Sequence, residues 1–98
     1  MLLAYDIGNT NIVVGLLDGE RIVGRWRFTT HRQRTADEMR FEARSVLAEA
    51  GVTPTDIDGI AAASVVPSLN STLTAGLHPL FETDILWVDA RTSPIRLD

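Results

Sequence analysis

A polar hexad, Asp-Ile-Gly-Asn-Thr-Asn at residues 6–11, carries the side chains whose types and spacing could do chemistry. It places one carboxylate, one glycine and three compact hydrogen-bonding side chains between two apolar runs, 2–5 and 12–17. Because Gly8 has no side chain, the backbone can turn tightly there and let a phosphate approach its N–H groups. The polar side chains that follow add donors. The hexad is therefore predicted to be a phosphate-binding turn at a strand-turn-strand junction.

Asp6 is the one acidic residue of this hexad. Its carboxylate would repel an anionic ligand unless a cation stood between them. Mg²⁺ fits that position, since it binds carboxylate and phosphate oxygens together while keeping several waters. Asp6 is thus predicted to organise magnesium and phosphate rather than to act as a base. The alternative is an ordinary tight hairpin, which uses the same residue types because they tolerate left-handed backbone or bond to it locally.

Composition narrows the class of protein. The chain has 98 residues, of which 45% are hydrophobic and 22% charged, so we expect one compact globular domain. A net charge of −4 gives no support to a nucleic-acid partner. No apolar run approaches the roughly 20 residues of a membrane span, so no membrane association and a cytoplasmic location are expected.

Two residue types are missing, and each absence excludes a kind of chemistry. There is no cysteine, which excludes disulfides and thiolate nucleophiles. The nine basic residues are all arginine, which excludes a P-loop with its phosphate lysine and any lysine Schiff base. A nucleotide would have to be bound by backbone amides, small polar side chains and a metal.

Three strands are expected to position the hexad. The apolar runs predict strands at 2–5 and 12–17, and alternating apolar residues predict a half-buried third strand over 20–30. Asp18-Gly19 is typical of a type I′ turn between the second and third strands. The three strands would form an antiparallel meander with the hexad at its first corner.

A helix is predicted next. Thr35 and Glu38 have the spacing of a capping box, an apolar stripe recurs at intervals of three or four, and Gly51 is placed to end the helix. The loop before it carries Arg32 and Arg34. These arginines are open to two interpretations, solvated loop charges or phosphate contacts.

The remaining elements continue the sheet. The apolar run 59–66 predicts a central strand that lies parallel to the first, because a helix intervenes. A second helix is predicted over 67–81 and a last strand over 85–88. The resulting order, β-β-β-α-β-α-β, indicates an α/β domain with a mixed sheet and helices packed on it. This order resembles the first half of the ribonuclease H-like topology of sugar kinases, actin and Hsp70, the actin-like ATPase fold, whose first hairpin corner holds nucleotide phosphates.

Four segments together resemble the type III pantothenate kinases, a family of that superfamily. They are the hexad, Trp-Arg-Phe-Thr-Thr at 26–30, Arg-Thr-Ala-Asp-Glu at 34–38, and Ser-Val-Val-Pro-Ser at 64–68. The resemblance runs over essentially the whole chain, with the segments in the family's order and approximate spacing. The same family includes homologues of the Bvg accessory factor.

The resemblance implies a kinase that uses ATP to phosphorylate the primary hydroxyl of pantothenate, giving 4'-phosphopantothenate in the first step of coenzyme A biosynthesis. It implies Mg²⁺, a monovalent cation such as K⁺ or NH₄⁺, and a homodimer. The reaction would be in-line phosphoryl transfer, in which positioning and charge neutralisation supply the catalysis. The implied ATP-phosphate segment comprises Asp6, Ile7, Gly8, Asn9, Thr10, Asn11, Ile12 and Val13.

One departure from the family pattern limits what is assigned. Family members carry a second domain with a Gly-Ala-Asp-Arg-like segment whose aspartate is the base, and this segment does not occur here. The catalytic base and the pantothenate ligands are therefore unknown, and the chain alone is expected to lack turnover. We expect a nucleotide-phosphate-binding domain over 1–88 and a linker over 89–98. The alternatives are a non-enzymatic regulatory protein like the Bvg accessory factor, and a sugar or acyl kinase of the same superfamily.

Overall fold

The first two strands flank the hexad, as the apolar runs predict. In the computed structural model, which describes residues 1–89, β1 spans Leu2–Ile7 and β2 spans Asn11–Asp18. The strands pair antiparallel with Ile7 opposite Ile12, so both strands extend into the hexad. Only its central residues form the connection between them.

The third strand follows through a tight turn. β3 spans Arg21–Thr29 and pairs antiparallel with β2, with Asp18 opposite Arg21. The predicted type I′ turn is wrong, because that type needs a positive φ at both central residues and only Gly19 has one, at 62°. A register shift between Leu16 and Leu17 accompanies this turn.

The first helix, α1, spans Ala36–Ala50 and begins at the predicted capping box. The Glu38 amide donates to the Thr35 hydroxyl at 3.1 Å, and the Thr35 amide donates to the Glu38 carboxylate at 2.9 Å. The bond from the Thr35 backbone is the main reason that the pKa of the Glu38 carboxyl is lowered. The helix ends at Gly51, whose φ of 75° is left-handed.

The parallel strands are also confirmed. β4 spans Gly59–Ser64 and lies parallel to β1, and β5 spans Ile85–Val88 and lies parallel to β4. The sheet order is therefore β3-β2-β1-β4-β5. The second helix, α2, spans Asn70–Leu77 and follows a 3₁₀ turn at Pro67–Leu69.

β4 ends two residues before the apolar run does. The Ser64 hydroxyl accepts a hydrogen bond from the Val66 amide at 3.0 Å, which turns the chain. Pro67 then has no N–H with which to continue a ladder. The strand therefore stops beside the hexad, where the Val65 amide donates to the Ile7 carbonyl at 3.0 Å.

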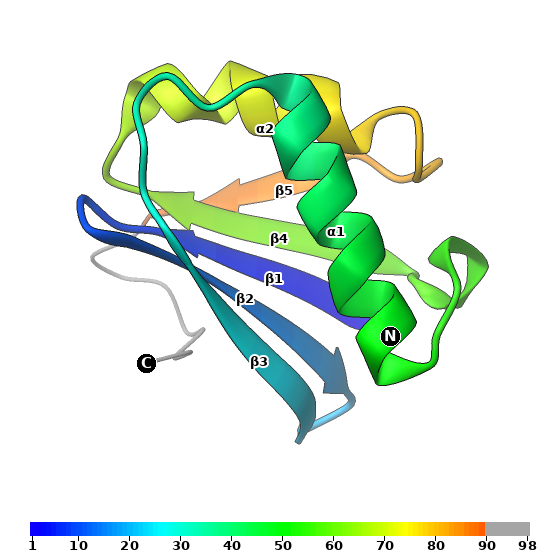
Figure 1. Ribbon diagram of the computed structural model, residues 1–98. Coiled ribbons are helices and arrows are strands. Elements are labelled where there is room, and N and C mark those ends of the chain that lie inside the picture. Colours follow the sequence, from blue (N-terminus) through cyan, green and yellow to red (C-terminus); the bar gives the residue numbers. More distant parts are fainter. Residues whose placement is uncertain (90–98) are drawn as a thin grey trace.

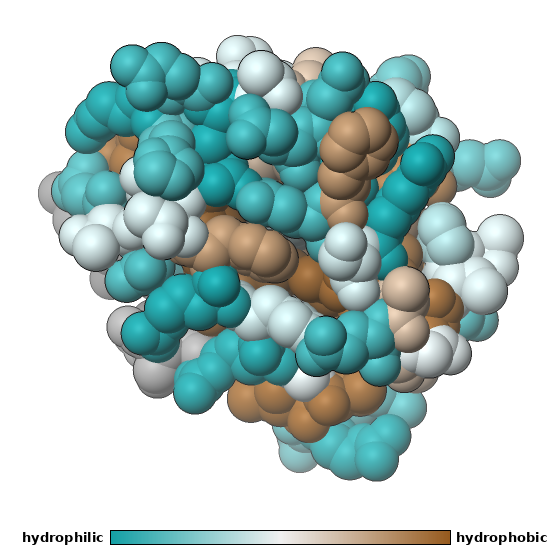
Figure 2. All heavy atoms as spheres, viewed as in Figure 1, coloured by the Kyte–Doolittle hydropathy of each residue, from teal (hydrophilic) through white to brown (hydrophobic). Residues whose placement is uncertain are grey.

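Both helices cover the same face of the sheet (Figure 1). The core lies between them and the strands, and its fully buried side chains include Leu3, Ile7, Ile12, Leu16, Met39, Leu47, Leu69, Leu73 and Leu77. The helix-bearing side of the molecule is mostly hydrophilic at its surface, with separate apolar patches (Figure 2). No helix within residues 1–89 is long and apolar enough to cross a membrane.

The expected domain boundary at residue 88 stays a prediction. Asp89 is the last residue that the structure describes, so the linker expected over 89–98 lies outside the described residues apart from that one position.

Candidate functional site

Strand alternation sends the Asp6 side chain to the sheet face opposite the helices. Its neighbours Tyr5 and Ile7 belong to the core beneath α1 and α2, and successive side chains of a strand point to opposite faces. On this opposite face Ala4 and Val13 form a small buried cluster of their own. The polar groups of the hexad therefore gather away from the main core.

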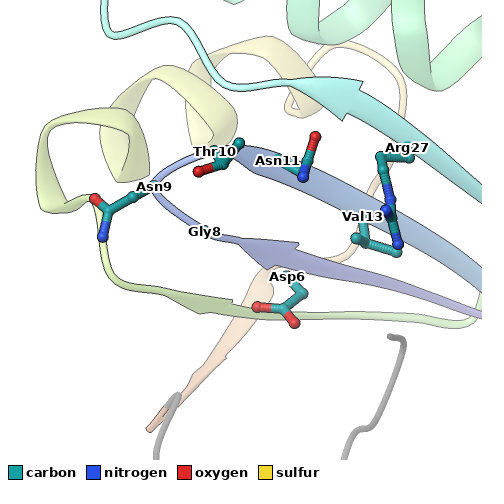
Figure 3. A pocket seen from close by; sticks show the side chains of 7 residues that line it. All are labelled: Asp6, Gly8, Asn9, Thr10, Asn11, Val13 and Arg27. Carbon is teal, nitrogen blue, oxygen red and sulfur yellow. The ribbon is translucent and has the colours of Figure 1, made fainter.

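A pocket of about 390 Å³ lies at this end of the sheet. Figure 3 shows its lining side chains, which come from β1, from the turn, and from β2 and β3. The lining residues are Asp6, Gly8, Asn9, Thr10, Asn11, Val13 and Arg27. Six of the eight residues predicted from the sequence are among them. The side chains of Ile7 and Ile12 are instead buried in the core, so these two residues could reach a ligand only through their backbone.

Gly8 has a different role from the one that the sequence suggested. Its N–H donates to the Asn11 carbonyl at 2.9 Å, so this amide closes the turn and is not offered to a ligand. Its φ is not positive, and a Cβ there would lie 3.1 Å from the same carbonyl oxygen. The glycine allows close approach of the two strand ends. Asn9 and Thr10, at the tip of the turn, are the candidates for backbone donors to a phosphate.

The turn is held from its other side by Thr30, which follows β3. The Thr30 amide donates to the Thr10 carbonyl at 2.9 Å, and its hydroxyl donates to the Gly8 carbonyl at 2.8 Å. Sequence reasoning missed this contact, although Thr30 ends one of the four segments that carry the family resemblance. Nothing in the local pattern distinguishes it from its neighbour Thr29.

Arg34 does not reach the pocket, so neither interpretation of this residue was right. Its guanidinium is buried, donates to the Thr29 carbonyl at 2.8 Å and forms an ion pair with Glu42. This contact anchors the loop that carries Thr30 to α1. Arg32 is exposed and donates to the Asn9 side-chain carbonyl at 3.3 Å, so it lies next to the turn.

Tyr5 lies behind the site, within the core. Burial raises the pKa of its phenol, and the nearby Glu42 carboxylate raises it further. Its hydroxyl oxygen is buried without a hydrogen-bond partner among residues 1–89. Tyr5 therefore stays a neutral phenol and supplies no acid or base to the pocket.

The donor set of the pocket fits a magnesium ion that is bound mainly through a ligand. Residues 1–89 contain no group of three or more His, Cys, Asp or Glu side chains that could hold a metal by themselves. Asp6 offers one carboxylate, and Mg²⁺ commonly takes one or two carboxylates together with phosphate oxygens and water. The residues present are thus suited to a metal that arrives with a phosphate.

Solved structures of two kinases are among those that share this fold. A ROK hexokinase from Thermus thermophilus matches with a TM-score of 0.65 and 16% identity, over 90% of this chain and 33% of that one. A putative N-acetylglucosamine kinase from Porphyromonas gingivalis matches with a TM-score of 0.60 and 22% identity, over 89% of this chain and 34% of that one. The five-stranded sheet with its two helices is the actin-like ATPase fold, which confirms the predicted fold class.

Sequence comparison specifies the family within this class. The family model for type III pantothenate kinase matches residues 2–98. A type III pantothenate kinase from Roseiflexus castenholzii is 45% identical over 94% of the chain, and one from Solibacter usitatus is 39% identical over the same share. The chain belongs to the type III pantothenate kinase family. It spans about a third of the length of these relatives, 36% and 35% respectively.

Proposed function

We propose that this protein binds the phosphates of ATP at the β1–β2 turn, as part of a kinase that transfers the γ-phosphoryl group of ATP to the primary hydroxyl of pantothenate. The observation that supports it most is the pocket at the turn, which six of the eight expected residues line. Membership of the family supports the choice of pantothenate as acceptor. The product would be 4'-phosphopantothenate, the first intermediate on the way to coenzyme A.

The residues of the turn have complementary roles in this proposal. The Asn9 and Thr10 amides at the tip would donate to phosphate oxygens, and Asp6 would hold Mg²⁺ against the same phosphates. Mg²⁺, when bound, supplies positive charge that offsets the phosphate charge. Catalysis would come from positioning and charge neutralisation in an in-line transfer. A monovalent cation, K⁺ or NH₄⁺, is proposed from the family alone, with no residue assigned to it.

Assembly and location are proposals of the same kind. Large apolar side chains are exposed on several elements, with Leu86 66%, Phe41 55% and Ile22 50% exposed, and such surface supports a homodimer. Sedimentation velocity at several concentrations tests this, and a single monomeric species at all of them would count against it. A cytoplasmic location is proposed because ATP, the cosubstrate, is an intracellular metabolite.

The test of the proposed function uses protein expressed from the complete reading frame of the gene, incubated with ATP, Mg²⁺ and pantothenate. Phosphorylated pantothenate is expected by mass spectrometry. Asp6→Asn is expected to lower kcat by about 100-fold, since the site loses the negatively charged carboxylate that would hold Mg²⁺. Asp18→Asn is the matched control, because Asp18 lies at the far end of β2 in a loose pair with Arg21 at 3.6 Å, and it should leave kcat unchanged.

Two outcomes would replace the proposal with one of its alternatives. Phosphorylation of a sugar or of acetate, with pantothenate left unmodified, would favour another kinase activity of the superfamily. Absence of transfer to any of these acceptors, together with a specific protein partner, would favour a non-enzymatic regulatory protein.

A further inference from the structure

Arg27 lies on the wall of the pocket opposite Asp6. Asp6 pairs with Val13 across β1 and β2, and Val13 pairs with Arg27 across β2 and β3, so the three residues form one row on one face of the sheet. Two strand spacings separate the ends of this row, about 10 Å between backbones. Figure 3 shows the Asp6 and Arg27 side chains on the same side of the strands, with Val13 near Arg27.

The guanidinium of Arg27 is available to a ligand. Its side chain is exposed, and no hydrogen bond or ion pair of this side chain is found within residues 1–89. Other arginines of the chain are already engaged: Arg34 pairs with Glu42, and Arg40 pairs with Asp37. Arg27 is also the one basic residue among those that line the pocket.

The chemistry of this wall matches a phosphate. A guanidinium keeps its charge at any physiological pH and presents a planar fork of N–H donors to two phosphate oxygens. The chain has no lysine that could take this role. A polyphosphate bridged to Asp6 by a cation on one side would leave its other oxygens facing the opposite wall, where Arg27 lies.

We propose that Arg27 is a phosphate-binding residue of this site, which donates to the polyphosphate chain of the nucleotide from the wall opposite Asp6. This inference rests on the proposed function, in that the pocket binds ATP. It adds a residue outside the 6–13 segment and makes β3 a part of the binding site. Arg27 would then discriminate ligands by their phosphate charge rather than by their base.

The test is isothermal titration of the protein expressed from the complete reading frame with Mg·ATP, with Mg·tripolyphosphate and with adenosine. Arg27→Gln is expected to weaken binding of both polyphosphates by about 10- to 100-fold, the value of a charge-assisted hydrogen bond. The affinity of Arg27→Gln for adenosine, which has no phosphate, should stay at the wild-type value. Arg27→Lys keeps the positive charge but loses the planar fork of N–H donors, so its affinity for both polyphosphates should lie between those of wild type and Arg27→Gln. Arg21→Gln is the matched control, since it removes an exposed arginine at the far end of the same strand.

The outcomes separate this inference from the proposed function. If Asp6→Asn abolishes binding of Mg·ATP while Arg27→Gln binds within twofold of wild type, the role of Arg27 is overturned and the ATP site stands. If Arg27→Gln and Arg21→Gln weaken binding equally, the effect is general electrostatics and the specific contact is overturned. If the wild-type protein binds neither polyphosphate, the phosphate site and the Arg27 contact fail together. Circular dichroism of each variant checks that folding is unchanged, as expected for an exposed side chain.

Discussion

Thr30 holds the β1–β2 turn from outside the turn: its hydroxyl donates to the Gly8 carbonyl at 2.8 Å, while its amide donates to the Thr10 carbonyl at 2.9 Å. A residue 22 positions further along the chain therefore sets the shape of the loop that carries Asn9. The loop that holds Thr30 is itself fixed by the buried Arg34. The geometry of the pocket depends on this chain of contacts as well as on the hexad.

Replacing Thr30 by valine should loosen the turn with little effect on the fold. The variant loses one neutral hydrogen bond, worth about 1 kcal/mol, so Mg·ATP affinity should fall by about fivefold. Titration calorimetry measures the affinity, and the free energy of unfolding should also fall by about 1 kcal/mol, because the bond is present without ligand. Thr74→Val is the control, because it loses the same kind of bond, to the Asn70 carbonyl at 3.1 Å, within α2. Wild-type affinity in Thr30→Val would contradict the role of this contact.

Removing the buried partner of Glu42 should be costly. Arg34→Leu leaves the Glu42 carboxylate and the Thr29 carbonyl without their donor, and the free energy of unfolding should fall by about 3 kcal/mol. The Arg34→Leu/Glu42→Leu double variant should regain part of that loss, because no unpaired charge remains. Urea unfolding measures both.

The control for the buried pair is the exposed pair between Arg21 and Asp18, whose side chains are 74% and 56% exposed. Arg21→Gln should change the free energy of unfolding by less than about 1 kcal/mol. Equal losses in Arg34→Leu and Arg21→Gln would show that burial does not decide the strength of these pairs.

The contact between the two helices should not tolerate a methyl group at Gly76. A Cβ there would lie 2.5 Å from the Ala36 carbonyl oxygen and 2.9 Å from the Met39 Cβ, so the helices must separate. Gly76→Ala should destabilise the protein by about 2 kcal/mol, although alanine is the better helix former. Gly59→Ala is the comparison, since its Cβ would meet the Leu2 Cδ1 at an ordinary 3.5 Å. A stabilised Gly76→Ala would mean that the helices are not in close contact.

The capping box predicts a dependence of stability on pH. The pKa of Glu38 is lowered in the folded chain from its ordinary value of 4.5, chiefly by the Thr35 backbone bond. A group whose pKa is lowered by folding stabilises the protein above its ordinary pKa, and this contribution is lost as the pH falls through the lowered value. Glu38→Gln keeps the bond without the titration, so its unfolding midpoint should fall less between pH 6 and pH 3 than that of wild type. Identical acid profiles would contradict this.

Removing the cap itself should be visible at neutral pH. Thr35→Ala loses the hydroxyl that accepts from the Glu38 amide, which should cost about 1 kcal/mol of unfolding free energy. Thr55→Ala is a suitable control, because Thr55 is exposed in a 3₁₀ turn and bonds only to the Thr53 hydroxyl among the contacts described for its side chain. Chemical denaturation at pH 7 measures the difference between the two variants.

Local patterns predicted the elements well, because each is carried by neighbouring residues. Thr35 with Glu38, and Gly51 at the helix end, depend on backbone groups within a few positions of each other. The turn at the hexad was likewise predicted, since glycine, asparagine and threonine at these positions are typical of a turn. These patterns could not predict which backbone amide is hydrogen-bonded within the turn. The Gly8 N–H is engaged because the register of β1 and β2 places the Asn11 carbonyl across the turn from it.

Long-range contacts of charged residues were beyond sequence reasoning for a different reason. Arg27 and Arg34 are both arginines near an end of β3, yet one lines the pocket and the other is buried against α1. The outcome depends on where Glu42 lies after the helix has packed on the sheet. No spacing rule relates an arginine in a loop to a carboxylate on the face of the next helix.

The central position of β1 in the sheet also determines the order in which its two neighbouring strands can pair with it during synthesis. Asp6 is flanked by Val13 on one side and Ala63 on the other, so its first neighbour leaves the ribosome soon after it and its second only some fifty residues later. The hairpin can form at once, while the open edge of β1 must wait for β4 through a slow, non-local closure. The residues that line the pocket, all within 6–27, are therefore synthesised and can pair well before β4 covers the second edge of β1.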